Sequence, residues 1–346
     1  MYEINSLRQY PAPSHDAAFE YLAADGRATI ARYHYEVAPN PTGVPRNAAF
    51  LFRELLLNRD ELIVLGAEPY DKRVPVFDRL ARRHDLVLHT SWPNWGTANV
   101  PQPTDSERRI ERWSDFLSRV HVVGVTEAAT DAAREFGARE ASHVPHGIDT
   151  DVYRPGAGQP GDERDRPVVL FVGRLERRKG VAQLLEIAAN WTGPEVTFRF
   201  VGDGPLADDV AAAARSDRVE YTGYVSDEER LASLYATSDA LALPSYAVPG
   251  WEELFGIVVI EAMACGLPVV ATDCVGPTEI LDDGETGFVV PQHATGALAD
   301  RLRRVVSDYG LRDRIGERAR ERAESEYDWA VTAEQWAAVY DDVRGA

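Results

Sequence analysis

The sequence lacks the residues that mark several classes of protein. It has two cysteines, two methionines and two lysines among 346 residues. Two cysteines cannot make the disulfide framework of a small secreted domain, and no CxxC or HExxH spacing indicates a metal site. No stretch approaches the roughly 20 apolar residues that cross a bilayer. Because no apolar run with basic flanks opens the chain, we expect no signal peptide and a reducing, cytoplasmic location.

Basic residues are also scarce. There are 37 of them against 56 acidic residues, which gives a net charge of −19. Such a chain repels nucleic-acid phosphates and anionic headgroups, so we expect no nucleic-acid partner and at most peripheral contact with the inner membrane face. Acid excess with almost no lysine is typical of a salt-loving host, where screening shortens the range of repulsion to about 3 Å at 1 M salt. A GC-rich genome with an ordinary acidic surface is the alternative.

Strand-like and helix-like segments alternate along the chain, most regularly in its second half. This alternation is typical of βαβ units around a parallel sheet. Ser226 and Glu229 form a capping box, which predicts a helix start. The predicted strands are 28–37, 61–67, 85–92, 120–126, 141–146, 168–174, 196–203 and 219–223. The predicted helices are 44–58, 74–83, 181–191, 205–215 and 226–238, and 93–106 is a predicted loop.

We predict two α/β domains that face each other across a cleft, because ligands bind at the carboxyl ends of parallel strands in such domains. Trp329, Trp336 and Tyr340 recur at helical spacing near the end of the chain, and we interpret them as core packing. The predicted parts are an N-terminal domain over 1–153, a Gly- and Pro-rich linker over 154–167, a second domain over 168–326 and a final helix over 327–346.

A basic cluster follows the first strand of the second half. That strand ends at Gly173, and the loop after it carries Arg174 and Lys179. Arginine offers a bidentate fork to phosphate and lysine a compact point charge. The cluster predicts an anion site at the carboxyl end of the strand. The alternative is a solvated turn whose charges balance nearby acids.

Segment 250–270 combines two glutamates with a predicted helix start at Phe255 and Gly256. The first amides of a helix offer an anion site. Glu253 precedes that start, and Glu261 lies eight residues later, about 12 Å along the helix. This span suits a ligand with a sugar at one end, phosphates over the amides and a ribose at the other. The alternative for Glu253 is charge complementation of the helix start, whereas Glu261 on an apolar helix needs a partner.

Four further positions carry weaker signals. Gly276 stands at a turn after a strand, where a glycine allows close approach of the backbone to a ligand. His89 ends a predicted strand at the edge that should border the cleft, and a purely structural histidine is the equal alternative. Gly43 and Arg46 precede a predicted helix on the same side, where a plain turn is the alternative.

Two motifs are interpreted as coincidental. VGDGPLA (201–207) fits the dinucleotide fingerprint G-x-G-x-x-A. However, Pro205 occupies the helix start, and the acidic residue expected about 20 positions later falls in a Glu-rich helix. Asp149 and Asp151 spell the DxD pattern of some metal sites, but they open the predicted linker, so we interpret them as a cap or turn.

Together, GRLERRKG (173–180), VGDGPL (201–206), EELFGIVVIEAMACGLPVVATD (252–273) and GPTEILDDGETGFVV (276–290) resemble the retaining glycosyltransferases of family 4, which have the GT-B fold. The resemblance is strong over 140–343 and includes VPHGIDTDVYRP, which looks like the family's interdomain crossover. Glu253 and Glu261 match the family's E-x7-E motif. His146 stands where the family commonly has asparagine, and the N-terminal, acceptor-side domain looks abbreviated.

The resemblance implies transfer of a hexose from a nucleotide-diphosphate sugar to a glycan or lipid-linked acceptor, with retention and with no cofactor or metal. It implies that Arg174 and Lys179 bind the diphosphate in place of a metal, that Glu253 contacts sugar hydroxyls and that Glu261 contacts the ribose. His89 would face the reacting sugar, and the last helix would cross back to the first domain. The other implied donor-site positions are Gly173, Phe255, Gly256, Ile257, Val258, Gly276 and, from the usual glycine pair of the acceptor-side loop, Gly43.

Three other functions fit parts of the sequence. A phosphorylase or a hydrolysing epimerase would use the same cleft, and release of nucleoside diphosphate without an acceptor would indicate one. A partner protein that binds a nucleotide sugar without turnover is a second alternative. A dinucleotide-dependent oxidoreductase is the third, and stabilisation by NAD would favour it.

Overall fold

The chain folds into two compact units. The computed structural model describes residues 1–8, 17–34, 53–54, 57–95, 100, 103–159 and 165–345. Unit 1 comprises 1–147, 249–251 and 329–346, and unit 2 comprises 148–248 and 252–328. Each unit is built on a parallel sheet, so the predicted α/β class with two Rossmann-like domains is confirmed.

Unit 1 contains a six-stranded parallel sheet in the order β2-β1-β3-β4-β5-β6. The order in which successive strands are added reverses between β1 and β3, as in doubly wound folds. The strands are β1 (Tyr2–Arg8), β2 (Ala28–His34), β3 (Leu62–Gly66), β4 (Asp85–Thr90), β5 (His121–Gly124) and β6 (Glu140–His143). The helices are α1 (Ala17–Ala24), α3 (Val74–Ala81), α4 (Glu107–Leu117), α5 (Glu127–Glu135) and α13 (Trp329–Gly345).

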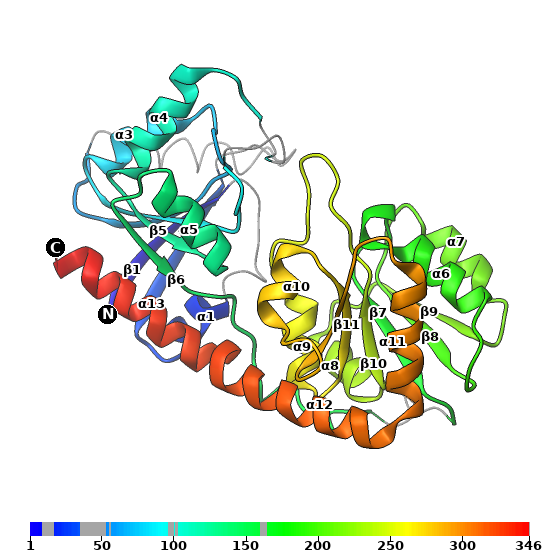
Figure 1. Cartoon of the computed structure of the whole chain (residues 1–346). Helices are drawn as coiled ribbons and strands as arrows, with labels where there is room; N and C mark the ends of the chain where they lie inside the picture. Colours follow the sequence, from blue (N-terminus) through cyan, green and yellow to red (C-terminus); the bar gives the residue numbers. More distant parts are fainter. Residues whose placement is uncertain are drawn as a thin grey trace. The chain divides into compact units, whose positions relative to one another are not determined.

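Helices cover both faces of this sheet because its strands are apolar on both sides. In β3, Ile63 packs into one hydrophobic cluster with α3 and α4, and Leu62 packs into another with α1 and α13. Trp336 and Tyr340 of α13 are 3% and 0% exposed, which confirms their interpretation as core, whereas Trp329 is only partly buried and lies outside the core. Figure 1 shows α13 beside β1 and α1, with both chain ends in this unit.

Unit 2 contains a second six-stranded parallel sheet, in the order β12-β11-β10-β7-β8-β9. The strand order reverses between β7 and β10, and such a switch point opens a crevice at the carboxyl edge of a sheet. The strands are β7 (Val168–Val172), β8 (Thr197–Val201), β9 (Val219–Gly223), β10 (Ala240–Leu243), β11 (Val269–Thr272) and β12 (Gly287–Val290). The helical segments are η2 (Arg177–Lys179), α6 (Val181–Ala189), α7 (Ala207–Ala213), α8 (Glu228–Ala236), α9 (Ile257–Ala264), α10 (Val275–Ile280), α11 (Thr295–Ser307), α12 (Tyr309–Arg322) and η3 (Ala323–Tyr327).

Apart from the short segment 249–251 of unit 1, the chain passes between the units at 147–148 and at 328–329. Inside unit 2 the two passages are joined, since the Ile148 amide donates to the Tyr327 carbonyl at 2.9 Å. The Thr150 hydroxyl also donates to Asp328 at 2.5 Å. The first passage therefore precedes the boundary predicted at 153, and the described parts of the predicted linker belong to unit 2.

The structure corrects several local predictions. The cap of α8 is Asp227, which accepts from the Arg230 amide at 2.7 Å, rather than the predicted Ser226. The structure also contains six elements that were not predicted from the sequence: β1, α1, α4, α5, α11 and α12. Most of the predicted helix at 44–58 lies outside the described residues. Among the helices that the structure describes, none is long and apolar enough to span a bilayer.

Candidate functional site

Loops from three neighbouring strands of unit 2 meet at the carboxyl edge of its sheet. The loop after β7 contacts the loop after β10, since the Tyr246 amide donates to the Arg178 carbonyl at 2.9 Å. The loop after β10 contacts the segment after β11, since the Gly276 amide donates to the Glu253 carbonyl at 3.0 Å. The strand-order switch point thus gathers the segments that carry most of the predicted site residues.

Lys179 and Glu253 form an ion pair within this loop cluster. The Lys179 Nζ lies 2.5 Å from Glu253 Oε2, and the two side chains are 19% and 11% exposed. The buried hydroxyl of Ser245 donates to the same oxygen at 3.0 Å. A cation, a carboxylate and a hydroxyl from two different loops therefore converge immediately before α9.

The N-terminus of α9 lies beside this pair. Gly256 is its N-cap, with φ of 92°, and no side chain caps the helix. A helix start without a side-chain cap leaves its first amides and their partial positive charge for an anion. Ile257 and Val258 in the first turn are partly exposed, whereas the Phe255 side chain is buried beside the Tyr327 ring at 6.2 Å. Phe255 can therefore offer only its backbone to a ligand.

Glu261 lies about one turn into α9, near a pair of tyrosines. Its Oε2 accepts from the Tyr235 hydroxyl at 2.6 Å, and Tyr153 lies nearby. Burial raises the pKa of Glu261, the two tyrosines lower it, and the net value is about 7. The side chain still has partial solvent access. The polar partner that this carboxylate was predicted to need is therefore the Tyr235 hydroxyl. One side of the carboxylate remains open.

Arg174 lies in the loop after β7 but is held differently from Lys179. Its Nε is 3.6 Å from Glu176 Oε2, and its side chain is 66% exposed. Glu176 also pairs with Arg178 at 2.8 Å. The structure therefore brings Lys179, and not Arg174, against Glu253. Gly173 follows the last residue of β7, and its amide donates to the Val201 carbonyl at 3.0 Å.

Two glycines of the site region are required by packing of the protein itself. A Cβ on Gly276 would lie 2.2 Å from the Phe255 carbonyl oxygen, so this glycine allows the segment after β11 to touch the approach to α9. A Cβ on Gly202 would lie 1.9 Å from the Gly173 carbonyl oxygen. The glycine of the dinucleotide-like motif therefore serves the contact between two neighbouring loops, which agrees with its interpretation as coincidental.

In unit 1, His89 lies near the end of β4 and is 6% exposed. Its ring is 5.6 Å from the ring of His146 and 5.2 Å from that of Trp336. This packing supports the alternative in which His89 has a purely structural role. Gly43 and Arg46 lie outside the described residues.

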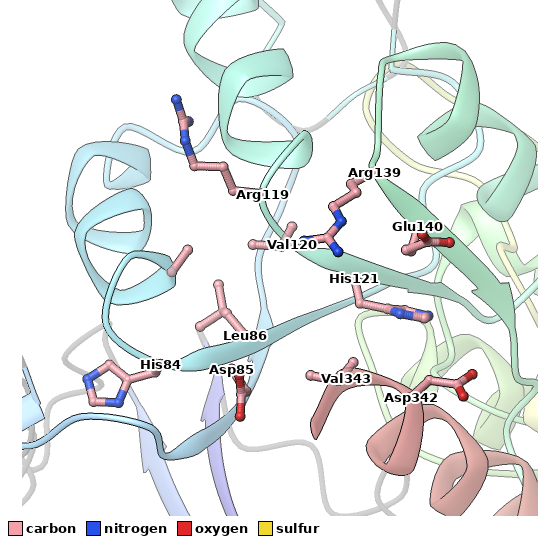
Figure 2. A pocket seen from close by; sticks show the side chains of 11 residues that line it. His84, Asp85, Leu86, Arg119, Val120, His121, Arg139, Glu140, Asp342 and Val343 are labelled. Atoms are coloured by element: carbon pink, nitrogen blue, oxygen red, sulfur yellow. The ribbon is translucent and has the colours of Figure 1, made fainter. Parts of the chain in front are cut away.

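In unit 1, a cavity of about 470 Å³ lies at the amino-terminal edge of the sheet, where β4, β5 and β6 begin. Figure 2 shows Arg139, Glu140 and Asp342 among its lining side chains. His121 in this cavity is bound to Ser142 at 2.9 Å, and burial lowers its pKa. Its mixed charges and its place at the amino ends of the strands separate this cavity from the predicted site.

No group of three or more His, Cys, Asp or Glu side chains that could hold a metal ion occurs in the described ranges. The DxD pattern forms a turn, because Asp149 accepts from the Asp151 amide at 2.9 Å. Cys265 and Cys274 are both buried and reduced. The interpretation of the DxD pattern as a turn is confirmed.

The sequence analysis missed Ser245, Tyr153 and Tyr235. Ser245 follows β10 directly, and its place after a strand was the available signal. The tyrosines gave none, because Tyr153 lies in the segment after the first passage and Tyr235 lies inside α8.

Comparisons with known proteins connect this geometry to one family. A family model described as "Glycosyl transferases group 1" matches residues 158–322. The chain is 34% identical over 352 residues to a phosphatidyl-myo-inositol mannosyltransferase of Mycobacterium tuberculosis, covering 97% of this chain and 88% of that protein. An alpha-D-kanosaminyltransferase of Streptomyces kanamyceticus is 37% identical over 52% of this chain, and the match spans about half of that relative, 46%. Among solved structures, a sucrose-phosphate synthase from Thermosynechococcus elongatus shares the fold, with a TM-score of 0.75, 22% identity and 99% coverage of both chains.

Proposed function

Because this chain belongs to the group 1 glycosyl transferases, we propose that it transfers a hexose from a nucleotide-diphosphate sugar to a hydroxyl of a glycan or lipid-linked acceptor. In this proposal the anomeric configuration is retained and no metal ion takes part. The single observation that carries it is the meeting of Lys179, Glu253 and the uncapped start of α9 in unit 2.

The diphosphate of the donor binds over the first turn of α9 in this proposal. The amides around Phe255 to Val258 donate to its oxygens, and Lys179 supplies the positive charge that a metal would otherwise supply. Arg174 adds a second cation from the same loop when a ligand draws it from Glu176. Gly173 and Gly276 line the site with backbone alone.

The two glutamates bind the hydroxyls at either end of the donor. Glu253 accepts from the hexose, and Ser245 and Lys179 keep its carboxylate oriented before the donor arrives. Glu261 accepts from the ribose about one turn into α9. Lys179 therefore contacts both the Glu253 carboxylate and the diphosphate. This shared contact places the sugar next to its leaving group.

Charge stabilisation supplies the chemistry of the transfer. When the bond between the anomeric carbon and the diphosphate oxygen breaks, negative charge grows on the leaving oxygens, and fixed cations and amides stabilise it. The acceptor hydroxyl attacks from the same face, and the departing phosphate takes its proton, so no covalent nucleophile is needed.

A thermal-shift screen followed by a turnover assay tests the proposed function. ADP, GDP, UDP, their common sugar conjugates and NAD are each added to the protein, and a nucleoside diphosphate or nucleotide sugar is expected to raise the melting temperature. The sugar conjugate that binds is then incubated with glycan and lipid-linked acceptors. Release of nucleoside diphosphate that depends on acceptor supports the transferase.

The same measurements separate the alternatives. Stabilisation by NAD alone indicates an oxidoreductase. Donor cleavage that needs no acceptor indicates an epimerase or a related activity, and donor binding without cleavage across the acceptor panel indicates a partner protein without turnover. Each of these three results contradicts the proposal.

A further inference from the structure

Two tyrosines from different parts of unit 2 converge on Glu261. Tyr235 comes from α8, is fully buried, and its hydroxyl lies 2.6 Å from Glu261 Oε2. Tyr153 comes from the segment that follows the first passage between the units, and it is 4% exposed. The two rings meet edge to face, with centroids 6.0 Å apart. The carboxylate therefore has one phenol donor at hydrogen-bond distance, Tyr235, and a second phenol, Tyr153, packed against that donor.

The tyrosine from the passage segment is anchored independently of Glu261. One guanidinium nitrogen of Arg320 in α12 donates to the carbonyls of Thr150 at 3.0 Å and Tyr153 at 2.7 Å. The same nitrogen donates to the carbonyl of Ala264, the last residue of α9, at 2.7 Å. Arg320 thus fastens the passage segment to the helix that carries Glu261, which fixes the distance between the Tyr153 ring and the carboxylate.

We infer that Tyr153 and Tyr235 are positioning residues, which hold the Glu261 carboxylate ionised and oriented so that its open side accepts the paired hydroxyls of a nucleotide ribose. The inference rests on the proposed function, in which Glu261 contacts the ribose. A carboxylate has about four lone-pair directions. The Tyr235 hydroxyl fills one of them from the protein side, with the Tyr153 ring packed against Tyr235, and the remaining directions are left for a ligand.

The surroundings of Glu261 explain why such donors are needed. The rest of α9, IVVI before it and AMA after it, is apolar, and a carboxylate in such surroundings loses hydration. Burial raises its pKa, Glu228 on α8 raises it as well, the tyrosines lower it, and the net value is about 7. Cys265 lies nearby with its thiol pKa raised, so it stays neutral, and the Arg320 charge is turned to the carbonyls at the end of α9. Burial also raises the pKa of both tyrosines, so they remain donors throughout the accessible pH range.

A preference for ribose over deoxyribose is the property to measure. The probe is whichever of ADP, GDP and UDP most raises the melting temperature, together with its 2′-deoxy form. The phosphates of both probes titrate alike near pH 6, so the ratio of the two affinities cancels that titration. Calorimetric affinities are measured from pH 5.5 to pH 9 for the wild type, Tyr235→Phe, Tyr153→Phe and Glu261→Gln, with Tyr309→Phe as a matched control because Tyr309 is 64% exposed on α12.

The wild type is expected to prefer the ribo form by about tenfold above pH 8, and to lose most of that preference below pH 6 with a midpoint near the pKa of about 7. Loss of either phenol should move the midpoint up by about one pH unit, which lowers the preference about threefold at pH 7 and restores it near pH 9. Glu261→Gln should abolish the pH dependence, and Tyr309→Phe should follow the wild type.

The outcomes separate the inference from the proposed function. A wild type that binds no nucleoside diphosphate, or that binds both forms equally, contradicts the proposed function. A wild-type preference whose midpoint is the same in both phenylalanine variants overturns the inference. Equal loss of both probes at every pH also overturns it, because that result describes a structural role alone. A midpoint that moves in one variant assigns the role to that tyrosine and removes it from the other.

Discussion

Removing the Lys179 side chain tests the centre of the proposed site. In Lys179→Ala, the carboxylate of Glu253, which is 11% exposed, keeps the Ser245 hydroxyl but loses its cation. An uncompensated, mostly buried carboxylate costs about 3 kcal/mol of the free energy of unfolding. For a unit of this size that loss lowers the melting temperature by roughly 6–12 °C. Transition-state charge stabilisation is lost as well, so turnover should fall at least tenfold.

Two further variants distinguish the loss of stability from the loss of chemistry. Lys179→Ala combined with Glu253→Gln removes the uncompensated charge, so the melting temperature should recover while turnover stays low. Arg177→Ala removes an exposed cation from the same turn, η2, and should retain turnover within about twofold. Acceptor-dependent release of nucleoside diphosphate and calorimetric melting measure both quantities. A folded Lys179→Ala protein that transfers sugar at the wild-type rate would refute this account of the site.

Four further outcomes are expected. Gly276→Ala should destabilise unit 2 and weaken nucleotide binding, because its Cβ would lie 2.2 Å from the Phe255 carbonyl oxygen; unchanged melting and binding would contradict the packing argument. Trp336→Ala should lower the stability of unit 1 by about 3–5 kcal/mol, since the ring packs 4.9 Å from that of Phe19, and urea unfolding measures it. The folded state raises the pKa of Glu261 from 4.5 to about 7 and so binds more protons than the unfolded state between those values. This group therefore contributes stability below about pH 4.5 that is lost as the pH rises through 7, and Glu261→Gln should flatten that part of the melting profile between pH 5 and 8. If the net charge of −19 reflects a salt-loving host, the melting temperature should rise between 0.1 and 1 M KCl, and no change would favour the GC-rich alternative.

The prediction of fold and family succeeded where its signals were short-range. The predicted strand at 219–223 coincides with β9, and the apolar run at 181–191 contains α6. In the first half the signals were weaker, and four described elements were missed. The motifs between 173 and 290 identified the family, because each is a contiguous segment whose glycines and charges are fixed by loop geometry.

The prediction of the site was less complete, because side-chain partners are not encoded locally. Arg174 and Lys179 share one loop and looked equivalent in the sequence. The structure pairs Lys179 with Glu253, 74 positions away, whereas Arg174 pairs with its neighbour Glu176. Gly276 was predicted to approach a ligand, and its measured neighbour is the backbone of Phe255.

The sequence by itself determined the alternation of strands and helices, the excess of acid, the glycine-bearing loops and the E-x7-E spacing. The acid excess follows from composition alone. The other three features depend on backbone propensity and on the 3.6-residue helical period, which act over a few residues. Only the tertiary structure decided that β7 and β10 are neighbours, and this adjacency brings Lys179 to Glu253. It also decided that Tyr153 and Tyr235 meet Glu261, because contacts between distant residues follow from the order in which the strands pair and from how the helices pack on them.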